Sequence, residues 1–122
     1  MKQEAKMADG IKYLGHSAFY IKSENYGILI DPWFLHNKSV NFDLDKEVIT
    51  HIIVTHGHGD HFGDTIQIAK YKNAEVIAIF ETGIYCQQQG VRAVGVGLGN
   101  AIPFGFGTVR FLPATHTNTL PN

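Results

Sequence analysis

The organisation of this chain follows from one heptapeptide near its middle, Thr55-His56-Gly57-His58-Gly59-Asp60-His61. The residues before it, 52–54, are a short β-branched run that predicts a buried strand. The residues after it, 62–72, carry apolar side chains at roughly helical spacing and predict a helix. We therefore expect the heptapeptide to be a loop at the C-terminal end of a strand, which is where ligands collect in α/β folds.

The side chains of this loop are those that bind metals. Imidazole and carboxylate groups are ordinary ligands of zinc, and they also suit iron and manganese. His56 and His58 are two residues apart, so in an extended turn both side chains leave on the same side. Asp60 and His61 are adjacent and point elsewhere, which suits a second metal roughly 3.5–4 Å from the first. The alternative is a solvated histidine-rich turn, but this density of donors after a buried strand favours a metal site.

Composition narrows the class of protein. The 122 residues, 44% hydrophobic and 17% charged, predict one globular domain spanning residues 1–122. Ten basic residues against eleven acidic ones leave no electrostatic footprint for nucleic acid or an anionic membrane. The longest apolar run, 76–80, is too short to cross a bilayer. Because Cys86 is the single cysteine and the first ten residues lack a signal-peptide pattern, we expect a cytoplasmic location.

The order of predicted elements indicates an α/β fold. We expect strands at 11–14, 17–22, 28–30, 75–80, 93–96 and 108–112, a loop at 33–46, and a helix at 81–89. Hairpin strands come first, and strands then alternate with helices, which favours a mixed sheet with helices on one face. The glycine-rich stretch 95–100 lacks the spacing of a dinucleotide fingerprint, and with Pro103 behind it we expect a turn-rich connection.

The central motif also carries a family resemblance. His56-x-His58-x-Asp60-His61 resembles the H-x-H-x-D-H signature of the metallo-β-lactamase superfamily. Residues 54–64 are similar to its branch of uncharacterised, lactonase-like metal-dependent hydrolases, and 14–19 and 30–34 resemble the opening strands of that branch. Residues 113–116 resemble the strand end that carries its third ligand histidine. The resemblance covers nearly the whole chain and implies the N-terminal half of a four-layer αββα sandwich.

The resemblance implies a set of ligands. One metal would be held by His56, His58 and His116, and a second by Asp60 and His61. Zinc is the expected divalent metal, with manganese or iron as alternatives. Asp60 is also expected to help orient the attacking water. An isolated histidine at a strand end is usually not a ligand, but His56 and His58 need a third donor, which favours His116 as a ligand.

Two further residues are expected beside the ligands. His16 follows a strand and a glycine, and we expect it near the metals as a supporting polar group, although it could merely end the strand. Asp31 either ends a strand before proline or accepts the second N–H of a ligand histidine, and the resemblance favours the second role. His36 and His51 have no such partner and are expected on the surface. Glu81 is expected to begin a helix and could edge the pocket.

The family pattern calls for two more ligands, a bridging aspartate and a later histidine. No acidic residue follows His116, so the chain is expected to be a truncated N-terminal half. The implied reaction is hydrolysis of an ester, lactone or phosphodiester of a small molecule by metal-activated water. The alternative is a non-catalytic metal-binding half-domain or scaffold. Strands apolar on both faces predict either a homodimer or pairing with a complementary second half.

Overall fold

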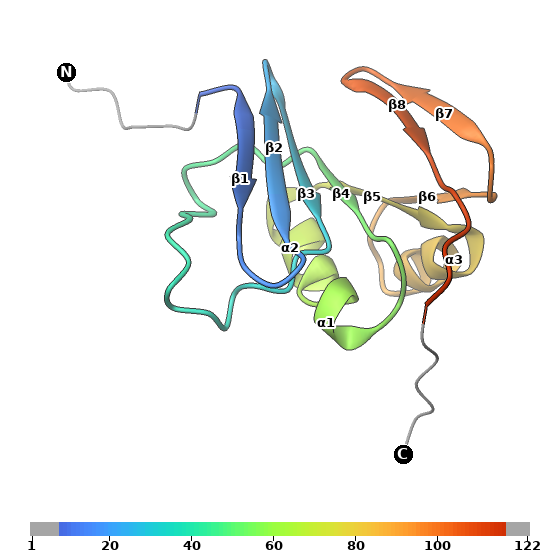
Figure 1. Ribbon diagram of the computed structural model, residues 1–122, viewed down its shortest axis with the longest axis horizontal. Helices are drawn as coiled ribbons and strands as arrows, with labels where there is room; N and C mark the ends of the chain where they lie inside the picture. Colours follow the sequence, from blue (N-terminus) through green and yellow to red (C-terminus); the bar gives the residue numbers. More distant parts are fainter. Residues whose placement is uncertain (1–7, 117–122) are drawn as a thin grey trace.

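The computed structural model describes residues 8–116, which form a mixed sheet with three helices and a separate hairpin (Figure 1). Six strands lie in sequence order across the sheet: β1 (Gly10–Tyr13), β2 (Phe19–Ser23), β3 (Tyr26–Ile30), β4 (His51–Ile53), β5 (Glu75–Ile79) and β6 (Ala93–Val96). The first three strands pair antiparallel, and β3 to β6 pair parallel. The predicted mixed α/β sheet is confirmed.

One face of the sheet carries the helices and the core. Tyr20, Leu29, Ile52 and Val76 are neighbours across the strand register, and none of them is exposed to solvent. They belong to a buried cluster that includes Ile68 and Ala69 of α2 (Thr65–Lys72) and Cys86 of α3 (Phe80–Gln88). Burying an aliphatic side chain of this size contributes about 1.5–3 kcal/mol to the free energy of folding. The packing on this face therefore holds in place the strands that lead to the site.

The helix predicted at 62–72 is two helices. α1 (Gly59–Phe62) begins inside the histidine-rich loop, and the chain turns at Gly63 before α2 starts. Gly63 has φ +46°, and a Cβ there would lie 2.6 Å from the Trp33 Cα. The next residue, Asp64, donates its N–H to the Pro32 carbonyl at 2.9 Å. The break occurs because the chain passes directly against the backbone that follows β3.

The second face is covered in part by a hairpin of which the sequence predicted only the second strand. β7 (Ala101–Phe104) pairs antiparallel with β8 (Gly107–Arg110), which overlaps the strand expected at 108–112, and a turn at 97–100 precedes them. β7 was not predicted; in a two-stranded sheet each strand has one neighbour, so β7 tolerates Pro103. Phe104 and Phe106 lie against the His51 ring, with centroids 5.8 and 4.8 Å away. His51, expected on the surface, is therefore only 14% exposed.

The other end of this second face, over β1 and β2, has no such cover among the described residues. Ile11 is 70% exposed, Tyr13 59% and Phe19 37%. The rings of Tyr13 and Phe19 pack on each other at 5.3 Å, so the three side chains form a contiguous apolar surface. Between residues 8 and 116, no helix is long and apolar enough to cross a membrane.

Candidate metal centre

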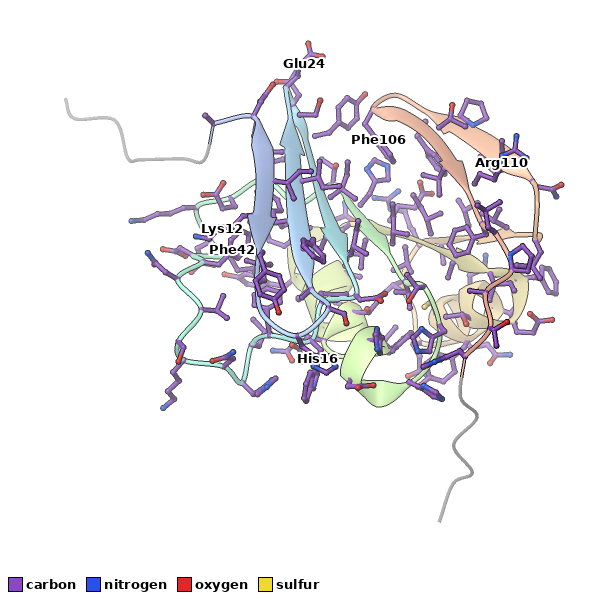
Figure 2. All side chains as sticks on the ribbon, viewed as in Figure 1. Lys12, His16, Glu24, Phe42, Phe106 and Arg110 are labelled. Carbon is purple, nitrogen blue, oxygen red and sulfur yellow. The ribbon has the colours of Figure 1, made fainter. Side chains whose placement is uncertain are left out.

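The histidine-rich loop leaves the C-terminal end of β4 and runs into α1. His58 precedes the helix with extended backbone, and its carbonyl accepts the N–H groups of His61 and Phe62 at 2.9 and 2.8 Å. Asp60 and His61 lie in the single turn of α1. Figure 2 shows His16 at the same end of the sheet, beside α1. The ends of β3 and β4 and the β1–β2 turn thus meet at one edge.

Three imidazoles form the first group of donors. His56, His58 and His116 each offer a ring nitrogen, and these atoms all lie within 4.8 Å of one another. His116 comes from the segment after β8, and its Nε2 lies 3.2 Å from the His58 Nδ1. The His56 ring is 4.8 Å from that of His58 and 4.7 Å from that of His116. The structure therefore brings together three residues that the sequence predicted as ligands of one metal.

The protonation of His56 follows from its neighbours. The Thr55 hydroxyl lies 2.6 Å from the Asp31 Oδ2 and 2.9 Å from the His56 Nδ1. A hydroxyl has one proton, which it donates to the carboxylate, so it accepts the Nδ1–H of His56. The Nε2 of His56 then carries a lone pair. This atom is buried and has no hydrogen-bond partner among the described residues.

An acceptor nitrogen that is buried, unpaired and aimed at two other imidazoles fits a metal ion. Burial lowers the pKa of His56, and the imidazoles of His61, His116 and His58 lower it further, with Asp31 opposing. The ring is therefore held neutral, which is the form that binds metal. Thr55 was not singled out in the sequence analysis. Its position directly before the first histidine could have suggested that its hydroxyl bonds to that ring.

Asp31 orients residues of the centre through hydrogen bonds. It directly follows β3, is 3% exposed and adopts φ +45°, a left-handed backbone that is strained for a residue other than glycine. Its carboxylate accepts the N–H of Thr55 at 2.8 Å, the hydroxyl of Thr55, and the Nδ1–H of His61 at 2.9 Å. It therefore fixes the tautomer of His61 directly and that of His56 through Thr55.

A second group of donors lies beside the first. His16, Asp60 and His61 offer three atoms within 4.8 Å of one another, and the His16 Nε2 lies 2.9 Å from the Asp60 Oδ2. The hydrogen bond from His16 is the main cause that lowers the pKa of Asp60, with His61 adding to it. Asp31 also lies within reach of His56 and His61. Because its oxygens already accept three hydrogen bonds, we read Asp31 as an orienting group and not as a ligand.

Two hollows flank the donors. A cavity of about 650 Å³ extends from His56 and His116 along the space between the sheet and the segment after β8. Its walls are mainly apolar and include Ile53, Leu98, Val109, Phe111 and Leu112. A smaller hollow of about 340 Å³ is lined by Gly57, Phe62, Glu81, Thr82 and Tyr85, so Glu81 does edge a pocket. The donors therefore lie beside space that a small molecule can enter.

Comparison with known sequences gives a consistent result. Residues 10–103 match the model of the beta-lactamase superfamily domain. The chain is 44% identical over 108 residues to a UPF0173 metal-dependent hydrolase of Geobacillus thermodenitrificans, covering 88% of this chain and 48% of that protein. It is 41% identical over 110 residues to the corresponding hydrolase of Alkaliphilus metalliredigens, covering 90% and 49%. The chain thus spans about half the length of these relatives.

Solved structures show the same fold. Igni18, a metallo hydrolase from the archaeon Ignicoccus hospitalis, superposes with a TM-score of 0.77 at 30% identity, covering 87% of this chain and 48% of that one. CmlA, a diiron β-hydroxylase from Streptomyces venezuelae, superposes with a TM-score of 0.68 at 20% identity, covering 91% and 25%, which shows a likeness of fold alone.

Proposed function

The chain belongs to the β-lactamase superfamily, and from that premise we propose that residues 1–122 are the N-terminal, metal-binding half of a metal-dependent hydrolase domain. The observation that carries the proposal is the buried Nε2 of His56, which has no partner among the described residues and faces two further imidazoles. The substrate we propose is a small molecule with an ester, lactone or phosphodiester bond.

Each donor has a stated part in this proposal. His56, His58 and His116 would hold one divalent metal, and Asp60 and His61 would hold a second, with zinc as the proposed ion. Bound metals of this kind lower the pKa of a water to about 7 and polarise the bond that is cleaved. Asp31 holds the rings of His61 and His56 in the tautomers that leave Nε2 free. Asp60, whose side chain is 45% exposed, would also help orient the attacking water.

The proposal also includes a partner for the apolar surface formed by Ile11, Tyr13 and Phe19. Either a second copy of this chain or a complementary second half of the domain would cover it. The donors proposed here do not include the bridging aspartate of the family pattern, which would fix the separation of the two metals, and a displacement of about 1 Å can cost about 100-fold in rate. We therefore expect the 122-residue chain alone to be a poor hydrolase. Cys86, a free and buried thiol, supports the cytoplasmic location that we propose.

Elemental analysis of the chain purified without chelator tests the metal site, and His56→Ala with His58→Ala is the matched variant. Metal in the parent chain and none in the variant is the expected result. If the parent chain and the double variant contain equal amounts of metal, the metal site lies elsewhere. Turnover of generic ester and phosphodiester substrates, with the chain alone and with a supplied second half, then separates the hydrolase from its alternative. Metal without turnover in either case identifies a metal-binding scaffold.

A further inference from the structure

The turn between β1 and β2 brings an imidazole to the exposed side of the centre. His16 lies at the tip of this turn, 44 residues before Asp60 in sequence, and its Nε2 is 2.9 Å from the Asp60 Oδ2. Together with His61 these residues offer two ring nitrogens and one carboxylate oxygen within 4.8 Å. The contact is tertiary, because the sheet and α1 come from different parts of the chain.

Several contacts hold His16 in place. Its backbone adopts φ +52° and the preceding Gly15 adopts φ +92°, so the turn carries two consecutive left-handed residues. Such a conformation is costly for histidine and persists only where the surroundings enforce it. The Tyr13 hydroxyl donates to the His16 carbonyl at 2.8 Å, and the ring meets the edge of Trp33 at 5.0 Å. The imidazole is therefore positioned before any ligand arrives.

The neighbouring donors complete the geometry. Since the Nδ1–H of His61 is donated to Asp31, the Nε2 of His61 is the free acceptor, and it lies 3.9 Å from the Asp60 Oδ1. In tetrahedral zinc sites with bonds of about 2.0–2.2 Å, neighbouring ligand atoms lie roughly 3.4 Å apart. The separations of 2.9 and 3.9 Å bracket that value. Exchange of a shared proton for a metal ion needs a shift of only about 0.5 Å on this comparison.

We propose that His16 is a direct metal ligand, which completes with Asp60 and His61 a second site of three protein donors. Three protein ligands and one open position are the arrangement of catalytic zinc sites. The inference rests on the proposed function, because it assigns a further ligand to the same centre. On metal binding the His16 ring takes the tautomer with its proton on Nδ1, so that Nε2 presents a lone pair.

The alternative is that His16 only orients Asp60 by a hydrogen bond, and three variants separate the two roles. His16→Gln keeps a side-chain N–H that can reach Asp60 but removes the imidazole. His16→Cys removes that hydrogen bond and supplies a thiolate, which is itself a metal ligand. His36→Ala is the matched control. The His36 ring also contacts the Trp33 ring, with centroids 4.3 Å apart, and His36 belongs to none of the donor groups.

The experiment is a Co²⁺ titration of the metal-free 122-residue chain, followed by visible absorption, with Zn²⁺ stoichiometry from calorimetry and folding checked by circular dichroism. We expect two bound ions in the parent chain and in His36→Ala. His16→Gln should weaken the second ion at least about 100-fold, beyond the range of about 10- to 100-fold that losing a supporting hydrogen bond costs. His16→Cys should restore binding and add a thiolate-to-cobalt charge-transfer band.

The possible outcomes are distinct. Binding by His16→Gln within about 10-fold of the parent, or a His16→Cys protein without the charge-transfer band, overturns the assignment of His16 and leaves the proposed function standing. One bound ion in the parent chain, at the His56 group only, has the same meaning. No bound metal in the parent chain overturns the proposed function and the inference together. Because the charge-transfer band is a gain of signal, a poorly folded His16→Gln protein does not prevent the decision.

Discussion

Replacement of Asp31 by asparagine removes the carboxylate that lies beneath both groups of donors. The Oδ2 atom accepts from the Thr55 hydroxyl and from the His61 Nδ1, whereas Oδ1 accepts from the Thr55 N–H. In Asp31→Asn one oxygen can keep the backbone hydrogen bond. The amide nitrogen then stands where Oδ2 stood, so a donor faces two donors. The substitution preserves shape and changes only charge and hydrogen bonding.

The magnitude follows from the number of hydrogen bonds lost. Each buried donor left without an acceptor costs about 1–3 kcal/mol, and two are affected. The Thr55 hydroxyl can rotate towards another acceptor, which reduces its share of this cost. We therefore expect the free energy of unfolding to fall by about 2–3 kcal/mol. The tautomers of His61 and His56 are then no longer fixed. Loss of such a supporting group lowers metal affinity by about 10- to 100-fold, or about 1.4–2.7 kcal/mol.

Competition with a chromophoric chelator measures Zn²⁺ affinity, and urea unfolding of the metal-free protein measures stability. Asp64→Asn is the matched control. Within residues 8–116 the Asp64 carboxylate accepts the N–H groups of Phe34 and Leu35 alone, and an amide oxygen can still accept both. Thr55→Val isolates the link to His56 and should weaken Zn²⁺ binding about 10-fold. Unchanged Zn²⁺ affinity in both Asp31→Asn and Thr55→Val would refute the role that we give to Asp31.

Other expectations concern pH, assembly and activity. Metal binding should weaken as pH falls through about 6.5, since ligand imidazoles must be neutral; pH-independent metal content between 7.5 and 5.5 would contradict this. Burial lowers the pKa of His51, with Glu75 opposing and Arg92 reinforcing the shift, so the unfolded state takes up protons first and the free energy of unfolding should drop as pH falls below about 6.5. In urea unfolding at pH 7.5 and 5.5, His51→Phe should lose less stability than the parent, and an equal loss would rule out His51 as the cause. The chain should self-associate at micromolar concentration, and Ile11→Glu should weaken that association; a persistent 13.5 kDa species in sedimentation velocity would argue against it. Turnover by the chain alone should be weak, so robust metal-dependent hydrolysis at high dilution would overturn that expectation.

Local patterns predicted the elements whose causes are local. The β-branched run at 52–54 and the glycines of the loop that follows it act through neighbouring residues. The strand, the loop and a following helix that they predicted are all present. The motif and the wider family resemblance pointed to seven site residues, and the structure brings all of them together at the C-terminal ends of β3 and β4. These features share a short sequence span or a specific motif.

Features that depend on distant contacts were not readable in the sequence. The break at Gly63 is set by the backbone of Trp33, thirty residues earlier, and no local signal separates it from an ordinary helical glycine. The burial of His51 depends on a hairpin more than fifty residues later. Each error has the same origin, which is that tertiary packing overrode a local preference.

The contact between His58 and His116 has a consequence for the chain as a polymer. These residues are 58 apart in sequence, and the segment from 111 to 116 that carries His116 has no regular secondary structure. A metal held by both rings would act as a crosslink, closing a loop whose entropy in the unfolded state is worth about 4 kcal/mol on the scale used for disulfides. That loop contains α1, α2, β5, α3, β6 and the β7–β8 hairpin. Removal of the metal by a chelator would therefore restore to the unfolded state the conformational entropy of a loop of nearly half the chain. The bound metal would thus stabilise the fold as a reversible crosslink.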